Sequence, residues 1–470
     1  MMRKIAEYGL EHLNKEYILK NRTPIIFDFR EASNRLFNDN KDNRNIQYIH
    51  YYPGRIFPYI PLYLLSSNDF AHLDGYLLDP FAGSGTILLE SIINPIVKRN
   101  SMGVEINPLG RLISKVKTTP LDFSKIEQFM QAIQSLYKHT INGKDYIPEF
   151  KNRELWFSYN AIKKLAKLKY AIENLDTSLD YKDFFWICFS TIIRKIAKAD
   201  PYIPPPVVLK PEKYINNSHK YEHLKNFLKH AEDPDVWSLF ESAVNNNRNK
   251  LEVLNKFEEL KYGTIKAEIV WDDARKIKKG CLLDRGMLDK KSVEDLHSYS
   301  IDLIFTSPPY LTAQKYIRTN KLELYWLGYS EKEVGNLEKI SIGTERIQKD
   351  LEISSLGIDS IDLLVDYALP KSSDRALMIY NYFKDITEAL KEMYRLLRKE
   401  GYAILVMGNN KVLGKKVDTY RLLTDAAIDV GFNEIVTLKD TIKSRSMMTK
   451  RNGSGGIIKD EYVIILKKEV

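Results

Sequence analysis

Two short stretches of the chain combine residue types that could hold a cofactor and a flat, polar substrate. Residues 79–86 read DPFAGSGT, and residues 306–310 read TSPPY. Because the first stretch is glycine-rich, its backbone can turn tightly and approach a ligand closely. The second is held rigid by two consecutive prolines and ends in an aromatic ring. The pair therefore indicates one loop for a cofactor and one for a substrate.

Buried strands must position both loops. The apolar run GYLL precedes the first loop, and the apolar run IDLIF precedes the second. Such runs are typical of parallel strands that are buried on both faces. In open α/β sheets, ligands bind at the carboxyl ends of the strands. We therefore expect both loops to lie at the same edge of one sheet.

Together the two stretches resemble the motifs of the amino-group DNA methyltransferases. That family moves a methyl group from S-adenosylmethionine to the exocyclic nitrogen of adenine or cytosine. Weaker matches lie at Tyr51–Pro61, Glu105, Asp273 and the last hundred residues. The resemblance covers about half of the chain and implies an α/β fold, a Rossmann-like methyltransferase sheet with helices on both faces. Between the two motifs, apolar residues recur at helical spacing, which predicts a largely helical insertion in this sheet.

The resemblance assigns the transfer chemistry to Ser307, Pro308, Pro309 and Tyr310. An exocyclic amine is a weak nucleophile because its lone pair is delocalised into the ring. The Ser307 side chain and the Pro308 carbonyl would accept hydrogen bonds from the amine, preorganised by the two prolines. Tyr310 would stack on the target base after it is flipped out of the duplex. Taken alone, the stretch could equally be a rigid turn after a strand.

The cofactor residues follow from the same resemblance. They are Asp79, Pro80, Phe81, Ala82, Gly83, Ser84, Gly85, Thr86, Glu105, Asp272 and Asp273. Asp79 is expected at the methionine amino group, and Ser84 and Thr86 could cap the next helix. Glu105 lies 20 residues after Gly85, the spacing at which a βαβ unit presents a carboxylate to ribose hydroxyls. Asp273 matches the acid at the cofactor's adenine, but its neighbour Asp272 leaves that choice open, and the pair could form an Asx turn instead.

Composition narrows the function class. A net charge of +9 and a pI near 9.0 favour an acidic partner such as nucleic acid, although a lysine-rich surface would give the same values.

The two cysteines have no CxxC spacing, and the HxxEH stretch at 219–223 has no further ligand nearby, so no metal is expected. The chain begins without an apolar signal region, and no apolar run could span a bilayer. We expect a cytoplasmic protein without a membrane partner.

The motifs also divide the chain into four parts. Residues 1–47 are an N-terminal extension, and 48–120 form the cofactor-binding half of the methyltransferase domain. Residues 121–262 form the helical insertion, a candidate for DNA binding and target recognition. Residues 263–470 form the catalytic half, in which 311–375 is a second candidate recognition segment. Near a glycine-rich turn at 453–456, four cations could contact DNA phosphates or simply be surface charge: Lys443, Arg445, Lys450 and Arg451.

These observations predict a site-specific methyltransferase acting on double-stranded DNA, either within a restriction-modification system that has a cognate endonuclease or as a stand-alone enzyme. Serine in the first position of SPPY favours cytosine-N4 over adenine-N6 as the acceptor, because serine is commonest there among the cytosine-N4 enzymes. Two alternatives remain open: an RNA guanine-N2 methyltransferase, or a non-catalytic nucleic-acid-binding protein on a methyltransferase scaffold.

Overall fold

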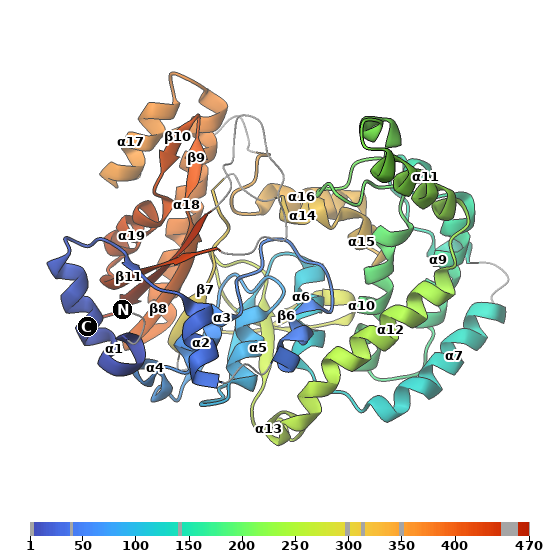
Figure 1. Ribbon diagram of the computed structural model, residues 1–470, viewed down its shortest axis with the longest axis horizontal. Helices are drawn as coiled ribbons and strands as arrows, with labels where there is room; N and C mark the ends of the chain where they lie inside the picture. Colours follow the sequence, from blue (N-terminus) through green and yellow to red (C-terminus); the bar gives the residue numbers. More distant parts are fainter. Residues whose placement is uncertain are drawn as a thin grey trace.

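The protein is built around a mixed eight-stranded sheet (Figure 1). The structure, a computed structural model, describes residues 4–37, 41–139, 143–296, 301–311, 315–346, 352–442 and 459–469. The strand order is β1-β11-β12-β8-β7-β2-β3-β4. The strands are β1 (Ile25–Ile26), β2 (Tyr76–Asp79), β3 (Ser101–Val104), β4 (Ala267–Trp271), β7 (Ile301–Thr306), β8 (Leu397–Gly408), β11 (Asn433–Thr441) and β12 (Asp460–Lys467).

The sheet direction places the two motif loops side by side. Strands β4, β3, β2, β7 and β8 are parallel neighbours, and β12 runs antiparallel between β8 and β11. DPFAGSGT follows β2 and TSPPY ends β7, and these two strands are hydrogen-bonded to each other. Both loops therefore leave the same edge of the sheet, as the sequence predicts.

Helices cover both faces of the sheet, and the strand residues are therefore buried on both faces. Leu303 and Phe305 of β7 belong to one apolar core, and Ile304 belongs to the other. The first core is covered by α1 (Lys4–Leu19), α2 (Phe29–Phe37), α3 (Tyr59–Leu65), α4 (Asn68–Ala71) and α5 (Thr86–Ile93). The second is covered by α17 (Asp359–Ala368), α18 (Ser373–Leu396) and α19 (Thr419–Val430). The expected α/β fold is confirmed.

A helical insertion separates β3 from β4 (Figure 1). After α6 (Pro108–Thr118) it comprises α7 (Ile126–His139), α8 (Arg153–Trp156), α9 (Tyr159–Glu173), α10 (Leu179–Ile196), α11 (Ser218–Glu232), α12 (Val236–Leu251) and α13 (Glu258–Lys261). Its core includes Phe184, Phe185 and Trp186 of α10. Because α10 also packs against α6 and α15 (Lys321–Trp326), the insertion shares a continuous apolar core with the catalytic half.

The remaining α-helices and strands lie in the catalytic half. They are α14 (Tyr316–Thr319), α16 (Glu331–Ile340), the hairpin of β5 (Lys279–Leu282) and β6 (Leu288–Glu294), and the hairpin of β9 (Asn410–Val412) and β10 (Lys415–Val417). Within the described ranges, no helix is long and apolar enough to cross a membrane.

Two elements differ from the sequence-based expectation. The apolar spacing at 382–397 predicts a helix that begins near Tyr382, but α18 begins at Ser373, because the Ser372 side chain accepts a hydrogen bond from the Arg375 backbone and caps an earlier turn. The N-terminal extension adds β1 to the sheet edge, where Ile25 pairs with Leu438 of β11. A two-residue strand is too short to produce a periodic signal in sequence.

Candidate active site

One pocket lies at the carboxyl edge of β2, β3, β4 and β7, with about 680 Å³ of open space. Its lining consists of Tyr52, Gly54, Pro80, Phe81, Gly83, Val104, Glu105, Ile106, Asp272, Asp273, Ala274, Arg275, Ser307, Pro309, Tyr316, Ile340, Ser341 and Ile342. Residues from both motifs and the predicted acids therefore share one cavity.

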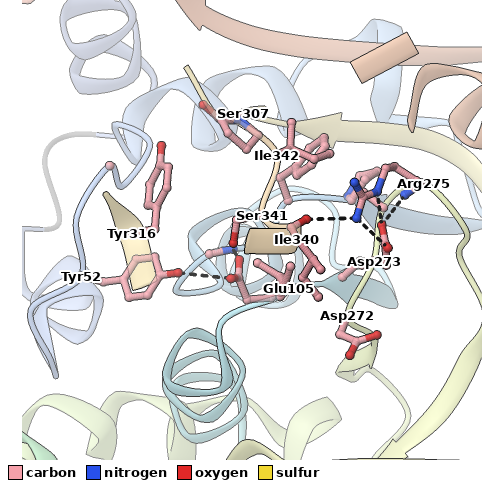
Figure 2. A pocket seen from close by; sticks show the side chains of 18 residues that line it. Tyr52, Glu105, Asp272, Asp273, Arg275, Ser307, Tyr316, Ile340, Ser341 and Ile342 are labelled. Atoms are coloured by element: carbon pink, nitrogen blue, oxygen red, sulfur yellow. Dashed lines mark hydrogen bonds and ion pairs between the residues drawn. The ribbon is translucent and has the colours of Figure 1, made fainter. Parts of the chain in front are cut away.

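Figure 2 shows how the side chains are distributed around this pocket. Tyr52 and Tyr316 lie on one side, and Arg275 with Asp273 lies on the other. Glu105 lies between them, and Ser307 lies at the top of the view. Seven predicted site residues do not belong to the lining: Asp79, Ala82, Ser84, Gly85, Thr86, Pro308 and Tyr310.

Asp79 instead joins the two motif loops. Its Oδ1 accepts a hydrogen bond from the Thr306 hydroxyl at 2.6 Å and another from the Phe81 backbone N–H at 3.1 Å. The side chain is buried, and burial raises the pKa of Asp79 to about 7. Because Thr306 directly precedes Ser307, this contact fixes the start of the second loop relative to the first.

Glu105 immediately follows β3 and accepts three hydrogen bonds. The Gly83 backbone N–H donates to Oε2 at 2.7 Å, and the Asn107 N–H and Tyr52 hydroxyl donate to Oε1 at 2.7 and 3.2 Å. Burial raises the pKa of Glu105, and the two N–H donors oppose that shift. A carboxylate has about four lone-pair sites, so Glu105 can still accept from a ligand in the pocket.

The glycine-rich loop needs its glycines for two reasons. Gly83 and Gly85 have φ values of +54° and +70°, a region that favours glycine. A Cβ on Gly85 would lie 2.2 Å from the Ser114 hydroxyl oxygen. The expected capping by Ser84 and Thr86 is wrong: Gly85 takes the N-cap position of α5, and its left-handed backbone replaces the extended conformation of a capping side chain.

The two neighbouring acids, Asp272 and Asp273, have different partners. Both oxygens of Asp273 accept hydrogen bonds from the Arg275 guanidinium at 3.0 Å, and the Arg275 backbone N–H adds an Asx-type contact. Arg275 also donates to Asp385 and to the Ile340 carbonyl, each at 3.0 Å. Asp272 pairs with the exposed Lys290 at 2.7 Å. The Asx turn is therefore present at Asp273, while both acids remain at the pocket wall.

Each residue of the SPPY loop has a definite environment. The Ser307 hydroxyl donates to the Val406 carbonyl of β8 at 3.1 Å. Pro308 is buried, and the Pro309 carbonyl accepts from the Tyr382 hydroxyl at 2.8 Å. The Tyr310 hydroxyl approaches Glu461 of β12 at 3.5 Å, a long contact. Burial raises the pKa of Glu461 to about 7.

Several pocket residues were not predicted as site residues from the sequence. They include Tyr316, Arg275 and the segment Ile340–Ile342. Tyr316 packs so closely on Gly54 that a Cβ there would lie 2.8 Å from its ring. None of these residues follows a motif strand directly, so no sequence spacing marks them. Tyr52 lies within the predicted Tyr51–Pro61 match.

Two other predictions concern residues away from the pocket. Lys443, Arg445, Lys450 and Arg451 lie outside the described residues. The HxxEH stretch falls on α11, and the part of the chain that the structure describes contains no group of acids, histidines or cysteines that could hold a metal.

The sheet order, with a glycine-rich loop after β2 and an acid after β3 at one pocket, is consistent with a Rossmann-like methyltransferase fold. The sequence relatives agree. Over 420 residues the chain is 23% identical to a protein named Type II methyltransferase M.MvaI, from Kocuria varians, covering 84% of each chain. It is 24% identical over 423 residues to Type II methyltransferase M.BsoBI from Geobacillus stearothermophilus, covering 80% of this chain and 77% of that one.

A third relative is Type II methyltransferase M.AvaI from Nostoc sp., 22% identical over 383 residues, with 76% of this chain and 73% of the other covered. These relatives confirm the resemblance to the methyltransferases that the motifs indicate. No protein-family model matches the chain. Among solved structures, the rRNA methyltransferase AviRa from Streptomyces viridochromogenes aligns over 91% of this chain and 94% of its own, with 9% identity and a TM-score of 0.30. At that score the alignment adds nothing to the fold assignment, which rests on the sheet.

Proposed function

We propose that this protein is a site-specific DNA methyltransferase that transfers a methyl group from S-adenosylmethionine to the exocyclic amine of a flipped base. The observation that carries the proposal is the single pocket shared by Glu105, at the cofactor side, and Ser307, at the substrate side. Transfer between two bound groups requires that both be held in line within one site. The relatives named Type II methyltransferases support DNA as the substrate.

The residues present fit S-adenosylmethionine. The backbone at Gly83 faces the pocket without a side chain, and Glu105 keeps an accepting site suited to a ribose hydroxyl. Asp272 or Asp273 would hold the adenine end, and Asp79 the methionine end through the loop it fixes. When bound, the cofactor supplies an electrophilic methyl group on a sulfonium.

Ser307 would prepare the acceptor amine. Because its hydroxyl hydrogen is donated to the Val406 carbonyl, its oxygen would act as the acceptor of an N–H from the target amine. That hydrogen bond would draw the amine nitrogen toward a tetrahedral geometry and stabilise the positive charge that develops on it. Pro308 would contribute its carbonyl in the same way, and Tyr310 would stack on the base.

We propose cytosine-N4 rather than adenine-N6 as the acceptor, on the serine in SPPY. We further propose that the helical insertion at 121–262 or the segment at 311–375 reads the target sequence, and that a cognate restriction endonuclease exists. A cytoplasmic location follows from action on cellular DNA.

The test is to incubate the protein with S-adenosylmethionine and mixed-sequence duplex DNA, digest to nucleosides and identify the products by mass spectrometry. N4-methylcytosine is the expected product. N6-methyladenine would reverse the choice of base while keeping the enzyme class. Product on RNA alone would replace the proposal with an RNA methyltransferase, and absence of cofactor binding in a titration would leave a non-catalytic scaffold.

A further inference from the structure

The β9–β10 hairpin directly follows β8, the strand whose Val406 carbonyl accepts the hydrogen bond of the Ser307 hydroxyl. Strand β8 carries the Val406 carbonyl that accepts from Ser307, ends at Gly408, and is followed by β9 from Asn410. Asn410 is buried, and its side-chain amide donates to the backbone carbonyl of Leu311, the residue after Tyr310. Figure 1 shows β9 and β10 beyond the end of β8, near α17. The hairpin is therefore anchored to the SPPY loop itself.

The outer side of this hairpin concentrates positive charge. Lys411, Lys415 and Lys416 are all exposed, whereas Val412 and Val417 are buried. The antiparallel register places Lys411 directly opposite Lys416. Like charges at directly opposite positions destabilise a strand pair. In the described part of the chain, none of these three lysines forms an ion pair with a carboxylate, so the hairpin tolerates an uncompensated repulsion.

A further cation joins this cluster from α17 and its following turn. The Lys415 ammonium lies 4.7 Å from the centre of the Tyr367 ring, and the Lys371 ammonium lies 3.1 Å from it. Lys371 is also exposed. Four cations thus gather around one short hairpin whose base contacts the catalytic loop. An extended polyanion passing over the pocket would relieve the repulsion among them.

We infer that the β9–β10 hairpin binds the phosphate backbone of duplex DNA beside the flipped nucleotide. The inference rests on the proposed function, since it concerns the DNA that the pocket would act on. Lys411, Lys415 and Lys416 contact phosphates, which position the duplex without reading its sequence. Because Asn410 ties the hairpin to Leu311, the same element sets the distance between the gripped backbone and the catalytic loop.

The salt dependence of DNA binding tests this role. We would measure the affinity of the full-length protein for a labelled duplex over a series of salt concentrations, for the wild type and for the triple variant Lys411→Gln, Lys415→Gln, Lys416→Gln. Each phosphate contact contributes about 0.9 to the slope of log affinity against log salt. The triple variant is expected to lower that slope by about 2 to 3, and an unchanged slope would overturn the inference.

A matched control removes the same charge elsewhere. Lys15, Lys391 and Lys399 are exposed and lie outside the segments proposed to read DNA; Lys15 is on α1, and Lys399 is on β8 at the opposite edge of the sheet. Their triple Lys→Gln variant is expected to leave the slope nearly unchanged. An equal loss in the control would show that only net charge matters, and would also overturn the inference.

The single variant Lys416→Glu separates DNA contact from a structural role. It places opposite charges at the paired positions 411 and 416, which stabilises the hairpin. The thermal unfolding midpoint is expected to stay the same or rise while duplex affinity falls several-fold. Unchanged affinity in this variant would contradict the inference. A wild-type protein that binds S-adenosylmethionine but neither binds nor methylates DNA would instead overturn the proposed function.

Discussion

The Ser307 hydroxyl and the Val406 carbonyl are joined by a hydrogen bond of 3.1 Å, which links the catalytic loop after β7 to the neighbouring strand β8. The bond fixes the direction of the hydroxyl hydrogen. The oxygen of Ser307, at the wall of the pocket, is left as an oriented acceptor.

Replacing Ser307 with alanine should therefore lower the rate of methyl transfer by about 100- to 1000-fold, the usual effect of losing one preorganised group that stabilises developing charge. The affinity for S-adenosylmethionine should remain within about twofold, because Ser307 belongs to the substrate side. Single-turnover rates and calorimetric titration would measure the two effects. Full activity of Ser307→Ala would exclude the acceptor role.

Tyr310 separates the contribution of a ring from that of a hydroxyl. Tyr310→Phe keeps the ring and loses the hydroxyl, with its long contact to Glu461 and its interaction with Ser307, so it should retain most of the activity. Tyr310→Ala should weaken productive DNA binding by about 10- to 100-fold, because stacking of a base on an aromatic ring contributes about 1–3 kcal/mol. Steady-state methylation of a duplex at limiting DNA would compare the variants. Equal activity of both would rule out stacking.

Glu105 should control the cofactor rather than the base. In Glu105→Gln, one of the two backbone donors, Gly83 or Asn107, would face an amide NH₂ in place of an acceptor oxygen. Hydrogen bonds to a charged group contribute about 1.5–3 kcal/mol, so the affinity for S-adenosylmethionine should fall by about 10- to 100-fold. Equilibrium dialysis would measure it, with Ser307→Ala as the matched control. Normal cofactor affinity in Glu105→Gln would remove Glu105 from the cofactor site.

His50 should make the stability of the fold depend on pH. Its Nδ1 lies 2.7 Å from the Tyr51 carbonyl, so it carries the proton, and Nε2 can accept from the Ser190 hydroxyl at 3.0 Å. Burial lowers the pKa of His50 from 6.5 to about 4. The folded state thus binds fewer protons than the unfolded state between these values, and stability falls as pH decreases through that window.

Between neutral pH and about pH 4, the titration of His50 should lower the free energy of unfolding by about 3 kcal/mol. Urea unfolding between neutral pH and about pH 4 would show this slope in the wild type, and His50→Gln should flatten it, since glutamine does not titrate. The same slope in both proteins would assign the acid sensitivity to other groups.

The sequence by itself determined the class of fold and the two loops that meet at the pocket. Apolar runs ending in DPFAGSGT and TSPPY predicted strand ends, because burial on both faces leaves a continuous apolar signal. The spacing from Gly85 to Glu105 predicted an acid beside the glycine-rich loop, since a βαβ unit has a nearly fixed length. In the structure, the Gly83 N–H donates to Glu105.

Tertiary structure alone decided which side chains complete the site. Val406 lies on β8, about a hundred residues after Ser307, and becomes its partner only through the strand order. Arg275, Tyr316 and the segment Ile340–Ile342 come to the pocket from separate elements, so no local spacing relates them. The repulsion between Lys411 and Lys416 likewise depends on the hairpin register. Local patterns encode strands and turns, whereas contacts between distant elements depend on how the cores pack.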